Sequence, residues 1–162
     1  MPVDPSPTLL VEGADTALLN SLKAVAASRG YRLVGEGEGG DSRPLAGALH
    51  LSPAIEVASL EEALARGPTR AFRFLRRSVP HLEAGAVVVL VAGGHGEGAP
   101  HLGVANEALL GLARAAAEDL RSRRIRVRCL GRGEEIDADT LAAVLVDALV
   151  GLDLLGGVRV LL

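Results

Sequence analysis

Short apolar runs alternate along the chain with longer segments in which apolar residues recur at helical spacing. This pattern predicts strands over residues 8–11, 31–34, 45–51, 86–92, 125–130 and 158–162. It predicts helices over residues 16–28, 59–81, 104–121 and 139–150. Gly67 and Pro68 interrupt the second helical segment, and proline suits a first helical turn better than an interior. We therefore expect two consecutive helices or one kinked helix there.

The alternation of strand and helix predicts the fold class α/β, with a single Rossmann-like three-layer domain over residues 1–162. Apolar strands that are buried on both faces are typical of a parallel sheet covered by helices on each side. We expect a parallel sheet of about six strands, joined by right-handed crossovers.

Composition and charge limit the classes of function. The chain has 162 residues, of which 49% are hydrophobic, and its formal net charge is −3. These values indicate a soluble globular protein with one core and no general attraction to nucleic acid. Arginines gather at residues 70, 73, 76 and 77 and again at residues 121, 123, 124, 126 and 128. We interpret both clusters as solvated helix faces and salt-bridge partners rather than as a nucleic-acid site.

Neither end of the sequence has the pattern of a targeting segment. The first residues lack a basic stretch followed by an apolar run, and Asp147, Asp153 and Arg159 interrupt the apolar C-terminal region. We expect neither a signal peptide nor a membrane span. The single cysteine, Cys129, cannot form an internal disulfide and is interpreted as a small core residue, which favours a reducing, cytoplasmic location.

A glycine-rich segment, GGHGEGAPHLG at residues 93–103, lies between a predicted strand and a predicted helix. Such a loop can bind phosphate, because exposed backbone N–H groups and a helix N-terminus attract anions. The segment fits a loose G-x-G-x-x-A pattern at Gly94, Gly96 and Ala99, but Pro100 and a helix expected to begin only at residue 104 aim the amides poorly. We therefore interpret it as a solvent-facing loop, with phosphate binding as the alternative.

Two further groups of polar residues have both a functional and a structural interpretation. His95, Glu97 and His101 are suitable metal ligands, but no fourth ligand is visible, so we predict exposed loop residues and no metal site. His50 and Ser52 have the residue types of a hydrolase pair. Alternate residues at the end of a strand explain these two more simply.

The stretch EALLGLARAAAEDLRSRRIRVRCLGRG, at residues 107–133, resembles the short-chain dehydrogenase/reductase family. The segments at residues 9–34 and 72–94 are similar in spacing to the family's opening strand–helix–strand unit and to its interface helix with the following strand. Ketoreductase domains of fatty-acid and polyketide assembly, including their shortened structural subdomains, are the most similar variants. The loop at residues 35–44 is too short for the helix and strand that usually complete the adenine-binding half, so the resemblance implies a shortened first half.

The residues that perform the family's chemistry are missing from the matching positions. The Y-x-x-x-K signature falls on Leu102 and Asn106, so the tyrosine acid and its lysine are both replaced. The catalytic serine falls near residues 91–92 and the helical asparagine near Gly67. Leucine has no proton to give, and an amide cannot supply the positive charge that lowers the pKa of a phenol. The resemblance therefore implies no catalytic residues.

The family's cofactor turn is also degenerate. Its T-G-x-x-x-G-x-G pattern falls on Glu12, Gly13, Ala17 and Leu19, and only Gly13 matches. The missing glycines normally let the backbone approach a pyrophosphate, which Leu19 would obstruct and Glu12 would repel. We therefore predict no bound cofactor and no cofactor-binding residues.

The helix predicted over residues 104–121 is apolar on nearly its whole circumference. One face, expected to pack on the sheet, comprises Leu109, Leu110, Ala113, Ala117 and Leu120. A second face of small and apolar residues comprises Val104, Ala108, Gly111, Leu112 and Ala115. A helix that is apolar all round is buried on two sides, so we predict that the second face is an interface. The alternative is that the alanines are simply good helix formers on an exposed face.

Two functional hypotheses follow. The first is a catalytically inactive short-chain-reductase-like subunit, acting as a structural or interaction partner, either as a homodimer or as a heteromer with a full-length reductase such as an active ketoreductase. In the resembling family, this helix and the one before it commonly form a four-helix dimer interface. The second is a small NAD(P)-dependent oxidoreductase or an acyl-thioester-binding enzyme with relocated catalytic residues.

Overall fold

The computed structural model describes residues 6–38, 44–52, 57–94, 99–132 and 136–151. Its strands are β1 (Thr8–Glu12), β2 (Arg32–Gly35), β3 (Leu45–Leu51), β4 (Leu82–Ala92) and β5 (Arg126–Gly131). Its α-helices are α1 (Thr16–Ser28), α2 (Leu60–Leu64), α3 (Arg70–Ser78), α4 (Pro100–Leu120) and α5 (Ala138–Leu149). Short turns of other helix types are η1 (Ala65–Thr69), η2 (Val79–His81) and η3 (Arg121–Arg123).

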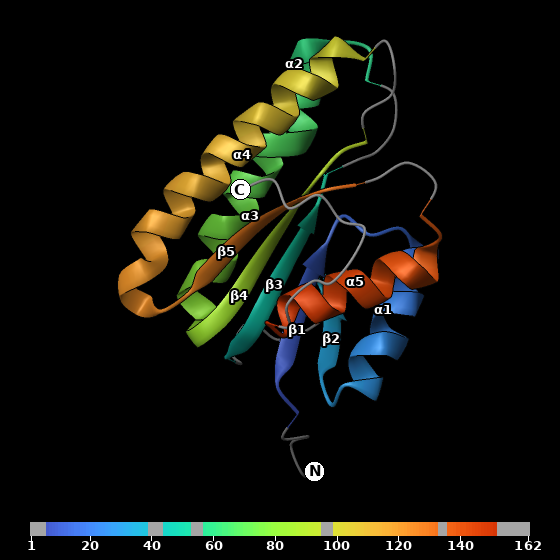
Figure 1. Cartoon of the computed structure of the whole chain (residues 1–162), viewed down its shortest axis with the longest axis vertical. Helices are drawn as coiled ribbons and strands as arrows, with labels where there is room; N and C mark the ends of the chain where they lie inside the picture. Colours follow the sequence, from blue (N-terminus) through green and yellow to red (C-terminus); the bar gives the residue numbers. More distant parts are fainter. Residues whose placement is uncertain (1–5, 39–43, 53–56, 95–98, 133–135, 152–162) are drawn as a thin grey trace.

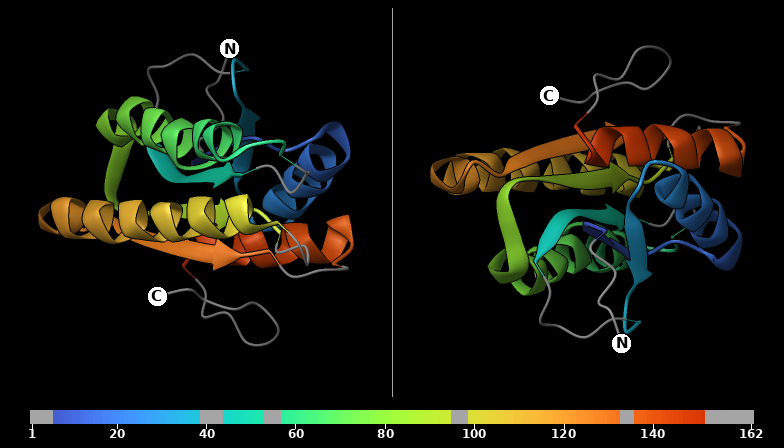
Figure 2. Two further views of the ribbon diagram at one scale, coloured as in Figure 1. Left: turned by 90° about the horizontal axis from the view of Figure 1, so that it is seen from above. Right: turned by 90° about the horizontal axis from the view of Figure 1, so that it is seen from below.

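The described strands form one parallel sheet with the order β2-β1-β3-β4-β5. Helices α1 and α5 cover one face of this sheet, and α3 and α4 cover the other (Figure 1; Figure 2). The sequence-based prediction of a three-layer Rossmann-like α/β domain is therefore confirmed. The sheet contains five strands in the described part of the chain, and the sixth strand, expected at residues 158–162, lies outside it.

Two hydrophobic clusters hold the three layers together, one on each face of the sheet. The cluster under α1 and α5 includes Leu22, Leu49, Val89 and Leu145, and the cluster under α3 and α4 includes Phe74, Leu90, Leu109 and Cys129. The middle strands contribute to both clusters, because successive side chains of a strand point to opposite faces. No helix in the described ranges is long and apolar enough to cross a membrane.

Residues 60–81 form a continuous helical segment rather than two separate helices. The π-helical turn η1 joins α2 to α3 and contains Pro68. A wider turn tolerates proline inside a helix, because it accommodates the ring and the missing N–H group. Gly67 in this turn is buried, and a Cβ atom there would lie 3.8 Å from the hydroxyl oxygen of Ser52. This is an ordinary van der Waals distance, so the packing of η1 beside Ser52 does not itself require glycine.

Two elements begin earlier than their sequence pattern predicts. Helix α4 starts at Pro100 rather than at residue 104, because proline provides a first helical turn with its fixed φ and needs no N–H partner there. Strand β4 starts at Leu82 rather than at residue 86. Its exposed stretch from Glu83 to Gly85 hid this start, since the apolar run begins only after it.

The turn after β1 requires glycine for two separate reasons. Gly13 has a φ of +88°, and a Cβ atom there would overlap the carbonyl oxygen of Leu51 at the end of β3. Gly30, which follows α1, has a similar φ of +79° but has open space around it. Gly13 therefore fixes how closely the β1–α1 turn approaches β3.

This difference predicts unequal effects of the same substitution at the two glycines. Gly30→Ala should lower the free energy of unfolding by about 1 kcal/mol, because only the left-handed backbone is strained. Gly13→Ala should cost about 3 kcal/mol or more, because the added methyl group also displaces β3. Urea unfolding followed by circular dichroism measures both, and equal losses would contradict this description of the turn.

Candidate functional site

The positions at which the family has its catalytic groups lie together in the structure. A small cavity at the carboxyl ends of β3 and β4 is lined by Ser52, Val57, Ala63, Gly67, Gly93, Leu102, Ala105 and Asn106. The lining of this cavity includes Gly67, Leu102 and Asn106, which match the family's asparagine, tyrosine and lysine. The cavity has a volume of about 10 Å³, which is room for a single water molecule at most. As far as the described residues show, this cavity has no room for a substrate.

The amide of Asn106 has a structural task. Its Nδ2 donates to the carbonyl of Gly93 at 3.1 Å, and its Oδ1 accepts from the N–H of Gly93 at 3.1 Å. Both bonds are buried, and they tie α4 to the residue that follows β4. Asn106 thus satisfies the N–H and carbonyl groups of Gly93, which lies beyond the end of β4. Neither Asn106 nor the buried Leu102 can supply a proton to a bound carbonyl.

His50 and Ser52 are buried at the end of β3 but do not form a catalytic pair. Neither ring nitrogen of His50 has a hydrogen-bond partner in the described structure, and the same is true of the hydroxyl of Ser52. The imidazole lies against the ring of Phe74, with 5.6 Å between the ring centroids. Burial lowers the pKa of His50 from 6.5 to about 4, and the charge of Arg70 acts in the same direction. His50 is therefore a neutral core residue at physiological pH.

In the turn between β1 and α1, where the family binds a dinucleotide, the carboxylate of Asp15 caps the helix. The side chain of Asp15 caps α1 and accepts a hydrogen bond from the N–H of Leu18 at 2.8 Å. This places a negative charge at the helix N-terminus, where the family binds a pyrophosphate. The sequence does contain the signal for this cap, because Asp15 directly precedes Thr16. The glycine pattern alone does not reveal it.

Glu12, at the end of β1, belongs to a charge network that the sequence did not predict. Its side chain is only 2% exposed, and it accepts hydrogen bonds from Arg70 Nε at 2.6 Å and from Arg77 at 2.7 Å. The same arginines also contact Glu36, which follows β2, at 3.3 Å and 3.1 Å. The bond to Glu12 raises the pKa of Arg70. The expectation that Glu12 would repel a cofactor treated its charge as uncompensated, whereas Arg70 and Arg77 compensate it.

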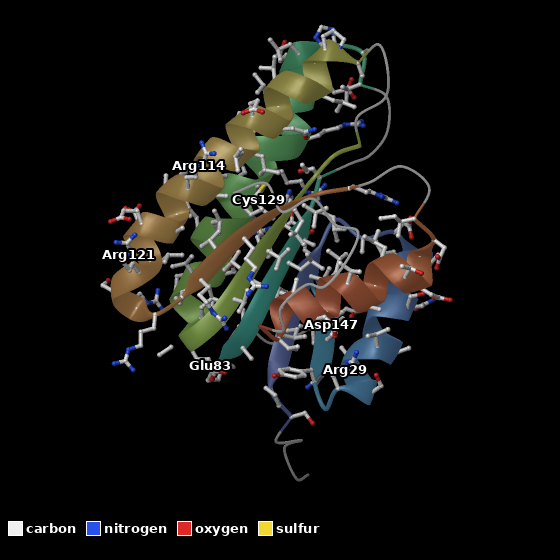
Figure 3. The ribbon with its side chains drawn as sticks, in the orientation of Figure 1. Arg29, Glu83, Arg114, Arg121, Cys129 and Asp147 are labelled. Carbon is white, nitrogen blue, oxygen red and sulfur yellow. The ribbon has the colours of Figure 1, made fainter. Side chains whose placement is uncertain are left out.

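The remaining polar candidates are not assembled into a site. His101 lies in the first turn of α4, while His95 and Glu97 fall outside the described ranges, and no cluster of three potential metal ligands occurs among the residues described. Gly96 of the suggested phosphate loop also lies outside them. Cys129 is buried beneath α4 (Figure 3), and burial raises the pKa of its thiol to about 11. As expected, this cysteine is an inert core residue.

The second face of α4 is open in the single chain. Val104, Ala108, Gly111 and Ala115 are all exposed, and nothing lies within 4 Å of a Cβ atom built on Gly111. Leu112 differs from the prediction, because it is partly buried and packs against the cluster under α3 and α4. On the opposite face of the helix, Leu109, Leu110, Ala113 and Leu120 are buried as predicted, whereas Ala117 is only partly buried.

No protein-family model matches the sequence, and no curated protein matches it. Solved structures do match. One is a short-chain dehydrogenase/reductase family oxidoreductase from Brucella ovis in complex with a partially ordered NAD, with 15% identity over 89% of this chain and 93% of that chain and a TM-score of 0.66. Another is a carbonyl reductase from Pseudomonas aeruginosa PAO1 in complex with NADP, with 14% identity over 89% of this chain and 92% of that chain and a TM-score of 0.64.

A short chain dehydrogenase family protein from Francisella tularensis is similar as well, with 12% identity over 91% of this chain and 78% of that chain and a TM-score of 0.61. Identities this low establish the fold alone. The chain has a Rossmann-like α/β fold, and within that class it has the fold of the short-chain dehydrogenases/reductases.

The burial of His50 predicts a specific dependence of stability on pH. Above pH 6.5 the imidazole is neutral in both states and has no effect. As the pH falls from 6.5 towards 4, the unfolded chain binds a proton that the folded chain does not, so stability is lost; below about pH 4 the loss is complete, at about 3 kcal/mol.

The variant His50→Leu should lack this loss. Between pH 7 and pH 5, the native protein should therefore lose about 2 kcal/mol more of its free energy of unfolding than the variant does. Reversible urea unfolding at both pH values measures the difference. Parallel losses in the two proteins would show that His50 is protonated or exposed in the fold.

Proposed function

We propose that the chain is a non-catalytic, cytoplasmic subunit with a reductase fold, which works by associating through α4 and the helical segment beside it. The partner is a second copy of this chain or a full-length reductase. The observation that carries the proposal is the exposed apolar face of α4, with Val104, Ala108, Gly111 and Ala115.

The distribution of exposed large hydrophobic residues supports this choice of surface. Among the described residues these are Leu60 at 39%, Phe72 at 49% and Val104 at 51% exposure. All three belong to α2, α3 and α4, which form the same layer, and none belongs to α1 or α5 (Figure 2). Exposed apolar side chains that gather on one layer are typical of protein–protein contact surfaces. Gly111 would let a partner helix approach to roughly 8–10 Å.

The state of the crevice supports the absence of catalysis. Asn106 is engaged with Gly93, Asp15 caps α1, and Glu12 is held by two arginines. Each group that would have to face a cofactor or a carbonyl is thus bonded within the chain or lacks a proton to transfer. An enzyme with relocated catalytic residues would need another group of reactive side chains, and the buried, unpaired His50 is not accessible to a substrate.

We expect the protein to bind neither NADH nor NADPH, because the carboxylates of Asp15 and Glu12 occupy the positions that a pyrophosphate would need. Isothermal calorimetry should give no binding at micromolar concentrations of either cofactor, with an active short-chain reductase measured in parallel as the positive control. Micromolar affinity corresponds to about −8 kcal/mol and would require a formed cofactor site, so it would overturn the proposal.

The proposed contact predicts a mass near twice the chain mass of 16.6 kDa, or a complex with a reductase from the same source. Gly111→Arg should give a folded monomer, because the long charged side chain enters the contact and its Cβ atom has open space in its own chain. Gly103→Arg is the matched control: it lies on the same helix, also has open space, and is outside the apolar face, so association should persist.

Multi-angle light scattering with circular dichroism distinguishes association from misfolding in both variants. A native protein that is monomeric at high concentration, and that captures no reductase from its own source, would remove the proposed function.

A further inference from the structure

A groove rich in arginine runs beside α3. It is lined by Glu12, Glu36, Ala65, Arg66, Arg70, Arg73, Arg76 and Arg77, and its volume is about 610 Å³. This volume lies within the range of about 300–1,000 Å³ that is usual for small-molecule sites. The groove shares no lining residue with the small cavity at Leu102 and Asn106, so it is a separate feature of the fold.

The charges that line the groove do not balance. Arg70 and Arg77 are both bonded to Glu12 and Glu36, so these two arginines and the two carboxylates neutralise one another. Arg66 pairs with Glu62 at 3.0 Å. Arg73 and Arg76 have no hydrogen bond or ion pair with any residue that the structure describes. The groove therefore presents at least two guanidinium groups that nothing within the described chain compensates.

This arrangement is unfavourable for the empty protein. Arg73 and Arg76 are three residues apart on α3, so their two uncompensated charges lie near each other on the helix surface, where like charges repel. Glu12 is almost fully buried and holds Arg70 and Arg77 in place, which fixes one wall of the groove before any ligand arrives. A bound anion would relieve the repulsion between Arg73 and Arg76.

We propose that this groove binds a small polyanion that carries two or more neighbouring phosphate groups and no large apolar part. The guanidinium fork matches phosphate oxygens in geometry and charge, and Arg73 and Arg76 are the residues available to bind them. Ala65 is the one uncharged residue of the lining, and no aromatic side chain lines the groove to stack on a nucleotide base. The inference does not depend on the proposed association.

Calorimetric titration of the native protein with pyrophosphate and with inorganic triphosphate tests the site. Both should bind, with triphosphate the tighter of the two, and the affinity should fall as salt is added. The variant Arg73→Gln/Arg76→Gln should bind at least tenfold more weakly. The control Arg114→Gln/Arg121→Gln removes the same charge from α4 and from the residue that follows it (Figure 3), and it should stay within twofold of the native affinity.

Three results would overturn the inference. The first is no binding of pyrophosphate or triphosphate at millimolar concentration by a protein whose fold is verified by circular dichroism. The second is an equal affinity of the groove variant and the control variant, which would indicate a non-specific charge effect. The third is tighter binding of ADP or of a single-stranded oligonucleotide than of triphosphate by more than tenfold, which would indicate that a base is recognised.

Discussion

The carboxylate of Glu12 ends the strand β1, lies almost entirely out of contact with solvent, and accepts hydrogen bonds from two arginines of α3. A buried carboxylate is stable only when such partners are present, because the loss of hydration otherwise exceeds any gain from packing. The bonds therefore fix α3 above the ends of β1 and β2. Glu36 extends the same network to the edge of the sheet.

This network stabilises the fold by linking β1, α3 and the residue after β2, although the turn after β1 lacks most glycines of a dinucleotide-binding turn. At the site where related folds place a cofactor, groups of the chain bond to one another: Asp15 caps α1, Asn106 bonds to Gly93, and Glu12 bonds to two arginines of α3. Asp15, Asn106 and Glu12 each have an internal hydrogen-bond partner, whereas the hydroxyl of Ser52, in the cavity beside Asn106, has none in the part of the chain that the structure describes. The exposed large apolar side chains of the described residues lie on α2, α3 and α4, and the arginine groove lies beside α3.

Local patterns predicted the elements well, because helical and strand periodicity are properties of neighbouring residues. The ranges of α1 and β3 agree with the sequence-based expectation at both ends. The second face of α4 is exposed in the single chain except at Leu112, and its role as an interface stays a prediction. The early start of α4 was missed because the glycine-rich stretch before it has the composition of a loop.

The charge network could not be found in the same way. Arg70 and Arg77 are 58 and 65 residues away from Glu12, so no local spacing links them, and only the sheet order brings β1 next to β2 and beneath α3. The arginine cluster itself was visible in the sequence. Two of its side chains are paired and two have no partner among the described residues, and this division depends on where Glu12 and Glu36 lie in the fold.

A double-mutant cycle between Glu12 and Arg70 tests most directly whether the internal charge network stabilises the fold. Unfolding free energies of Glu12→Gln, Arg70→Gln and the double variant should give a coupling of at least about 1 kcal/mol, and the half-exposed guanidinium keeps it below the value for a fully buried pair. The exposed pair Lys23–Glu38, treated in the same way, should show little coupling. Additive effects of the two substitutions at Glu12 and Arg70 would contradict the account.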